Sequence, residues 1–169
     1  MNIRIIREND SEQFLLLGKE LDEETQFMML APGERTITVE EQAQRIRNVL
    51  SRDNQVIFVV EHENQLIGFL GAYGEIYRRS HHCVYIVIGI LQNFTGQGIG
   101  KQLFETVEKW ALDHKLHRLE LTVMSHNERA IRLYQKMGYQ TEGIKQDSLW
   151  VNGEYVDEYY MSKILGQSQ

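Results

Sequence analysis

Two kinds of hydrophobic pattern alternate along the chain. In the first, apolar and β-branched residues form short runs or occupy every second position, which predicts strands. In the second, apolar residues recur every three or four positions, which predicts amphipathic helices. The predicted strands cover residues 3–6, 56–61, 66–73, 84–91, 118–124, 139–150 and 155–164. The predicted helices cover residues 11–21, 39–50, 101–116 and 128–137.

Local signals mark the ends of several elements. Thr38, followed three residues later by Glu41, forms a capping box that starts the helix at residue 39. Asp10 or Ser11 is expected to cap the first helix. The pairs Glu63-Asn64 and Asn152-Gly153 predict tight turns, so strands 56–61 and 66–73 form one hairpin and the last two strands form another. With no repeat or linker in the sequence, residues 1–169 are expected to form a single domain.

A glycine-rich stretch lies between the strand at residues 84–91 and the next helix. Gly96, Gly98 and Gly100 alternate there, just before Lys101. A strand that turns through glycines into a helix presents backbone N–H groups at the positive end of the helix dipole, which favours a phosphate ligand. A Walker A loop needs four residues between its first glycine and Gly-Lys, and only three separate Gly96 from Gly100. The Rossmann fingerprint requires a glycine at the position of Lys101.

A second motif follows about thirty residues later, after one predicted strand. Residues 127–139 read Asn-Glu-Arg-Ala-Ile-Arg-Leu-Tyr-Gln-Lys-Met-Gly-Tyr. Asn127 is a good N-cap and Gly138 a good helix terminator. The residues that share one face of this helix are Ala130, Leu133, Tyr134 and Met137.

Together the two motifs resemble the GCN5-related N-acetyltransferase (GNAT) superfamily. The glycine stretch is similar to its pattern Arg/Gln-x-x-Gly-x-Gly/Ala, although Thr95 stands at the Arg/Gln position. Residues 127–139 are similar to its pattern Asn-x-x-Ala-x-x-Leu-Tyr-x-Lys-x-Gly-Phe/Tyr. The resemblance implies the α/β (α+β) GNAT fold: a mixed, mostly antiparallel central sheet of about seven strands with flanking helices. The order β-α-α-β-β-β-α-β-α-β-β read from the pattern agrees with it.

The resemblance also implies a co-substrate and the residues that bind it. Acetyl-coenzyme A would place its diphosphate on the amides of the glycine loop. Its pantetheine arm would lie along the main chain of the central strand at Ile88 and Ile90, where Gly89 permits close approach. The full set of implied cofactor-binding residues is Ile88, Ile90, Thr95, Gly96, Gln97, Gly98, Ile99, Gly100, Lys101, Asn127 and Tyr134.

By the same resemblance, Tyr134 is the acid that protonates the departing thiolate. A tyrosine with a pKa of about 10 is protonated at neutral pH, as this role requires. Glu75 and His82 are the candidates for the base, because they lie on or beside strands expected to flank the acceptor. His81, Tyr85 and water alone are alternatives. Glu120 alternates with apolar neighbours and is expected to point outward.

The composition of the chain argues against several kinds of partner. A net charge of −6 argues against general nucleic-acid binding. No apolar run is long enough to span a bilayer, and the single Cys83, expected to be buried, suits a reducing compartment, so a cytoplasmic protein is expected. The six histidines show no spacing typical of metal ligands, so no metal is expected.

The resemblance implies direct transfer of an acetyl group from acetyl-CoA to a primary amine, with a small amine or amino acid as the acceptor. A protein N-terminus or lysine side chain is the alternative acceptor. Two other classes stay open: a non-catalytic module that binds acyl-CoA, which the threonine at position 95 favours, and a nucleotide-phosphate protein. The resemblance also implies a homodimer.

Overall fold

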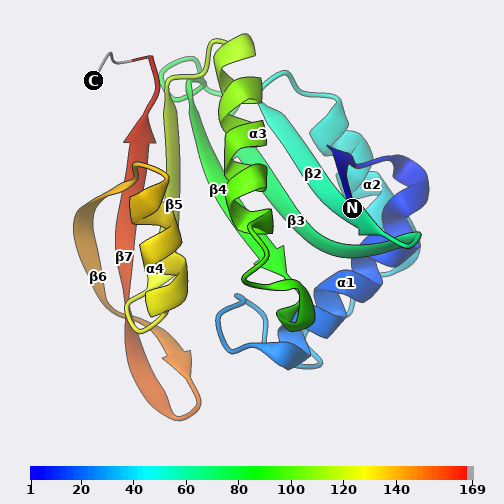
Figure 1. Cartoon of the computed structure of the whole chain (residues 1–169), viewed down its shortest axis with the longest axis horizontal. Helices are drawn as coiled ribbons and strands as arrows, with labels where there is room; N and C mark the ends of the chain where they lie inside the picture. Colours follow the sequence, from blue (N-terminus) through cyan, green and yellow to red (C-terminus); the bar gives the residue numbers. More distant parts are fainter. Residues whose placement is uncertain (167–169) are drawn as a thin grey trace.

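The computed structural model describes residues 1–166 and builds them around one seven-stranded sheet (Figure 1). The strand order is β1-β2-β3-β4-β5-β7-β6, and every neighbouring pair is antiparallel except β4 and β5, which are parallel. The expected mixed, mostly antiparallel sheet is confirmed. The strands are β1 (Asn2–Ile5), β2 (Gln55–His62), β3 (Gln65–Gly74), β4 (Cys83–Ile90), β5 (Arg118–Met124), β6 (Gln140–Val151) and β7 (Glu154–Ile164).

Four α-helices cover the sheet: α1 (Ser11–Glu24), α2 (Val39–Leu50), α3 (Ile99–Asp113) and α4 (Glu128–Lys136). Adjacent residues of β4 show that α1 and α3 lie on opposite faces. A side chain added at Gly89 would meet Leu21 of α1, whereas the side chain of Ile90 lies beside Gly100 of α3. Figure 1 shows α3 and α4 together on one face. No helix within residues 1–166 is both long and apolar enough to cross a bilayer.

Local sequence signals account for where these elements begin and end. Helix α2 has the predicted bounds, and its capping box is present: Thr38 Oγ1 accepts from the Glu41 amide at 3.1 Å, while the Thr38 amide donates to the Glu41 carboxylate at 2.7 Å. Both predicted hairpin turns have positive φ angles, 49° and 63° in the first and 51° and 83° in the second. Helix α3 packs on the sheet through a buried stripe, with no exposed surface on Leu103, Phe104, Val107 and Ala111.

Two expectations need correction. Asp10 precedes α1, but its carboxylate makes no capping bond; it accepts instead from the guanidinium of Arg4 at 2.7 and 2.9 Å and from the Arg7 amide. A charged partner from β1 offers a stronger hydrogen bond than the helix amides do. Cys83 is only half-buried, because it lies at the start of β4. Two 3₁₀ turns, Glu8–Asp10 and Gln92–Phe94, were not predicted.

Strands β4 and β5 form a fork, and the functional site is built around it. Their parallel pairing covers three residue pairs, from Cys83–Arg118 to Tyr85–Glu120. Past Tyr85 the two strands separate, while β4 keeps its pairing with β3 as far as Ile90. The sheet is therefore closed at one end of β4 and open at the other, where the chain enters the glycine loop.

Candidate active site

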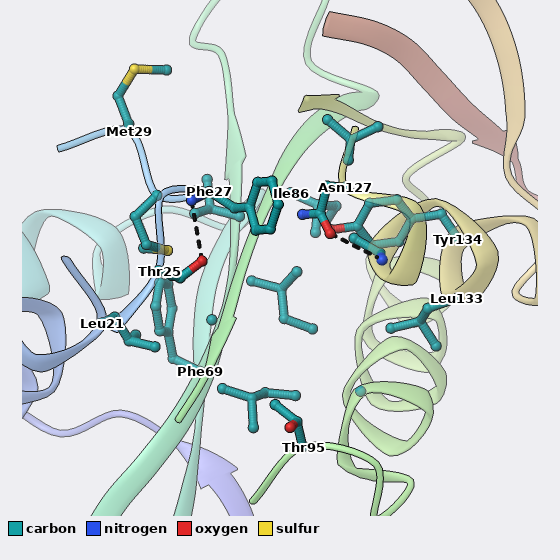
Figure 2. A pocket seen from close by; sticks show the side chains of 18 of the residues that line it. Leu21, Thr25, Phe27, Met29, Phe69, Ile86, Thr95, Asn127, Leu133 and Tyr134 are labelled. Atoms are coloured by element: carbon teal, nitrogen blue, oxygen red, sulfur yellow. Dashed lines mark hydrogen bonds between the residues drawn. The ribbon is translucent and has the colours of Figure 1, made fainter. Parts of the chain in front are cut away.

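The fork opens into a large cleft, with a cavity volume of about 1250 Å³. Its walls come from α1 and the following loop on one side and from α4 on the other, with β4 between them (Figure 2). Thr95 lies at the end of the cleft that the glycine loop closes (Figure 2). The cleft therefore runs from the glycine loop, past the open edge of β4, to the opposite face of the sheet.

The glycine loop has a backbone that other residues would strain. Gly96 and Gly98 have φ angles of +79° and +81°, in the left-handed region that favours glycine. Gly100 serves packing instead, because an added Cβ would lie 2.7 Å from Leu133 Cδ2 of α4. The first two glycines thus shape the turn, and the third brings α4 close to the start of α3.

Helix α3 presents an anion site to the cleft. Gly98 is its N-cap, and its first intrahelical bond runs from the Gln102 amide to the Gly98 carbonyl at 3.1 Å. The amides of Ile99, Gly100 and Lys101 therefore have no partner within the helix. With the positive end of the helix dipole, they can accept the oxygens of a phosphate group.

Tyr134 and Asn127 lie on the α4 wall (Figure 2). Asn127 caps α4, with its side-chain oxygen accepting from the Ala130 amide at 3.3 Å. Tyr134 is 7% exposed and packs edge-on against Phe104, with ring centroids 5.5 Å apart. Burial raises the pKa of the Tyr134 phenol above its ordinary value, so the hydroxyl keeps its proton at neutral pH. The geometry suits a proton donor that faces the cleft.

The structure brings nearly all of the predicted cofactor-binding residues to this cleft. Gln97 is the exception: it does not line the cleft, and its side-chain amide donates to the Asn93 carbonyl at 3.3 Å. The ten that line it are Ile88, Ile90, Thr95, Gly96, Gly98, Ile99, Gly100, Lys101, Asn127 and Tyr134.

The two residues expected to supply the base lie elsewhere. Glu75 and His82 are in the connection between β3 and β4, at the closed end of the fork, and neither lines the cleft. The His82 carbonyl accepts from the amides of His117 and Arg118, which ties this segment to the start of β5. Their assignment as the base is therefore not retained. Glu120 lies at the end of the three-residue junction and pairs with Arg118 at 2.6 Å, outside the cleft.

A buried carboxylate that the sequence pattern did not reveal lines the cleft instead. Glu158 of β7 is 4% exposed and lies opposite Met124, the last residue of β5. Ser148 Oγ donates to its carboxylate at 2.9 Å, and Lys145 Nζ is 3.5 Å away. Glu24, the other carboxylate that lines the cleft, already accepts from the Gln92 amide at 2.8 Å. Both carboxylates that line the cleft therefore accept hydrogen bonds within the protein, and Glu158 is the one beside the open end of the fork.

The loop after α1 closes over this side of the cleft. The ring of Phe27 lies 5.0 Å from that of His126, on the opposite wall, and Figure 2 shows Phe27 beside Asn127. Asn152 at the tip of the β6–β7 hairpin donates to Gln26 Oε1 at 3.0 Å. Both contacts join the loop after α1 to segments on the other side of the fork, so this loop partly covers the cleft.

The charge of the cleft differs from that of the whole chain. Five cationic side chains line it against two carboxylates, in a protein whose net charge is −6; two of the five are paired outside the lining, Arg35 with Asp22 at 2.7 Å and Lys101 with Glu105 at 3.6 Å. A cationic lining in an acidic protein favours an anionic ligand. The five are Arg35, Arg45, Lys101, Arg129 and Lys136.

Comparison with known proteins agrees with this geometry. Residues 19–139 match the family model described as the acetyltransferase (GNAT) family. Over 64 residues the chain is 38% identical to the L-amino acid N-acetyltransferase AaaT of Escherichia coli, a match that spans 38% of each protein. The solved structure of an acetyltransferase of the GNAT family from Streptococcus pneumoniae is 26% identical, with a TM-score of 0.94, covering 98% of this chain and 99% of that one.

A second solved structure shares the fold. It is yncA, a putative acetyltransferase from Salmonella typhimurium solved with acetyl-CoA, which superimposes with a TM-score of 0.87 at 16% identity. That match covers 100% of this chain and 96% of the other.

Proposed function

The chain belongs to the acetyltransferase (GNAT) family, and we propose that it transfers the acetyl group of acetyl-CoA to the amine of a small molecule such as an amino acid. The observation that carries the proposal is the fork between β4 and β5, with an anion site at one end and a partly covered pocket holding Glu158 at the other. The acetyl donor and the amine would enter from opposite faces of the sheet and meet at the fork.

On the donor side, the amides at the start of α3 would hold the diphosphate of acetyl-CoA. The extended pantetheine arm would follow the edge of β4 that has no strand neighbour past Tyr85. There the main chain around Ile88 and Ile90 supplies hydrogen-bonding groups. An amide aimed at the thioester oxygen would stabilise the negative charge that develops during attack.

The transfer needs a neutral amine, because a protonated one has no electron pair for the attack. Free aliphatic amines have pKa values of about 10, so at neutral pH the acceptor must first lose a proton. We infer that Glu158 takes this proton, directly or through a water molecule. The neutral nitrogen would then bond to the thioester carbon and release its extra proton to solvent as the carbon–sulfur bond breaks. The thiolate would receive the proton of Tyr134, which regains one from solvent.

The partial cover over the acceptor side favours a small acceptor over a protein. The Phe27–His126 and Gln26–Asn152 contacts cover part of the acceptor side of the cleft, whereas a folded protein substrate needs an open surface around the amine. The similarity to an L-amino acid N-acetyltransferase supports the same choice. The single cysteine and the requirement for acetyl-CoA favour a cytoplasmic enzyme.

The test is thiol release from acetyl-CoA with a panel of acceptors, read together with mass spectrometry of the products. The panel contains amino acids, polyamines, aminoglycosides and peptides with a free N-terminus. We expect a mass gain of one acetyl group on a small primary amine. Acetylation of peptides alone would contradict the small-molecule acceptor. Binding of acetyl-CoA without release on any amine would support the non-catalytic alternative.

A further inference from the structure

The phosphate-binding end of the cleft has a cation that the glycine pattern does not include. The family pattern has Arg or Gln at position 95, where this chain has Thr95. The Thr95 hydroxyl donates to the Gln92 carbonyl at 2.6 Å and so closes its own turn. Lys101 is the cationic side chain that the loop itself supplies, and it pairs with Glu105 at 3.6 Å.

Arg129, the second residue of α4, reaches this end of the cleft from the opposite wall. A Cβ placed on Gly96 would lie 3.4 Å from Arg129 Nη2, so the guanidinium rests against the glycine loop. The side chain is exposed and lines the cleft. Within residues 1–166 it makes no ion pair, whereas Arg132 on the same helix pairs with Glu128 at 3.4 Å.

The position of Arg129 follows from the packing of α3 against α4. Because Gly100 has no side chain, Leu133 of α4 approaches the start of α3 closely. Arg129 lies four residues before Leu133, so it shares that face of α4 and projects over the glycine loop. The loop amides and the guanidinium therefore face the same volume from two sides.

We propose that Arg129 binds the diphosphate of coenzyme A, taking the role that an Arg or Gln at position 95 has in the family pattern. This inference rests on the proposed use of acetyl-CoA. A guanidinium presents parallel N–H groups that match two phosphate oxygens, and its charge is fixed at all physiological pH values. The arrangement is a clamp: α3 amides hold one side of the diphosphate and Arg129 holds the other.

Calorimetry with coenzyme A and with 3′-dephospho-coenzyme A tests the proposal. We expect Arg129→Ala to weaken the binding of both ligands by about tenfold to a hundredfold, the range typical of a lost charge-assisted hydrogen bond. Arg132→Ala, on the same helix, is the matched control and should change either affinity less than twofold. Arg129→Lys, which keeps a point charge without the fork, should fall between wild type and the alanine variant.

Each other outcome has a clear meaning. Equal affinities for wild type and Arg129→Ala would overturn the proposal. A loss confined to coenzyme A would move Arg129 to the 3′-phosphate and overturn the diphosphate assignment. Failure of the wild-type protein to bind either ligand would instead refute the proposed function. Melting curves of all variants separate a binding defect from a folding defect, and the lysine variant keeps the test open if the alanine variant does not fold.

Discussion

The hydroxyl groups of Tyr85 and Thr122 lie 2.6 Å apart and share a hydrogen bond across the base of the fork. Tyr85 belongs to the last residue pair of the parallel junction between β4 and β5. Thr122 lies two residues beyond its partner, on the same face of β5, so the bond extends the link between the strands past the end of their backbone pairing. It links the two strands at the point where the fork opens, on the side proposed for the acceptor, and both residues line the cleft.

Replacing Tyr85 with Phe should weaken the link between β4 and β5 where the fork begins. The free energy of unfolding is expected to fall by about 0.5–1.5 kcal/mol, the usual net value of one hydrogen bond. The KM for the amine should rise more than the KM for acetyl-CoA, because the bond lies on the acceptor face. Tyr77→Phe, at an exposed position in the β3–β4 connection, is the control. An unchanged KM for the amine would contradict this role.

Replacing Tyr134 with Phe should slow the chemical step. Loss of a general acid typically lowers kcat by about 10²- to 10⁴-fold. The KM for acetyl-CoA should stay within about threefold of the wild-type value, since the ring remains in place. Steady-state kinetics measure both constants. If kcat were unchanged, another group would have to protonate the thiolate.

Tyr139→Phe is a matched comparison with an opposite expectation. Tyr139 packs edge-on against the same Phe104 ring as Tyr134, at 5.3 Å, but its buried hydroxyl has no hydrogen-bond partner in the described part of the chain. Leaving a buried polar group unpaired costs about 1–3 kcal/mol. Removing this hydroxyl should therefore raise the free energy of unfolding, by about 1 kcal/mol, with kcat unchanged. Urea titration measures the free energy of unfolding. A variant less stable than wild type would show that the Tyr139 hydroxyl makes a hydrogen bond in solution.

Gly89→Ala should destabilise the protein through packing on the α1 face. The added methyl group would lie 2.7 Å from Leu21 Cδ1 and 2.9 Å from Phe69 Cε1. Overpacking of this kind costs about 1–3 kcal/mol. Gly143→Ala in β6 is the control, because its Cβ would have its nearest neighbour 4.0 Å away. Equal melting temperatures for the two variants would show that Leu21 and Phe69 adjust freely.

Asp10→Asn should remove stability at neutral pH and much less in acid. The hydrogen bonds from Arg4 lower the pKa of the Asp10 carboxyl below its ordinary value. A group with a lowered folded-state pKa stabilises the protein above the unfolded pKa of about 3.9, and this contribution disappears as the pH falls through the folded-state pKa. The expected loss is about 1–3 kcal/mol at pH 7.

Urea titrations at pH 7 and pH 3 measure this dependence. The difference in the free energy of unfolding between wild type and Asp10→Asn should be smaller at pH 3 than at pH 7. Glu12→Gln, at an exposed position in the first turn of α1, should show no comparable gap at either pH. A gap of equal size at both pH values would assign the effect to packing rather than to charge.

The sequence predicted the features that depend on neighbouring residues. Capping at Thr38, the turn at Asn152-Gly153 and the glycine loop before α3 all follow from local backbone preferences, and the structure has each of them. The two short motifs that carry the resemblance are local in the same way, and residues of both line the cleft.

Features that depend on distant parts of the chain were missed. Glu158 joins the site because β7 inserts between β5 and β6, which no local pattern predicts. Asp10 was expected to cap α1, but it binds Arg4 instead, because β1 lies beside it. Glu75 and His82 were placed near the acceptor because the strands they flank were expected to face it, but the open end of the fork lies at the far end of β4.

The short pairing between β4 and β5 leaves the sheet incomplete beside the site. Because only three residue pairs join the two strands, an extended molecule can lie in the gap and form main-chain hydrogen bonds there. The proposed pantetheine arm would lie along this unpaired edge of β4 and take the place of a neighbouring strand. Binding of the donor would then connect the two halves of the sheet past Tyr85.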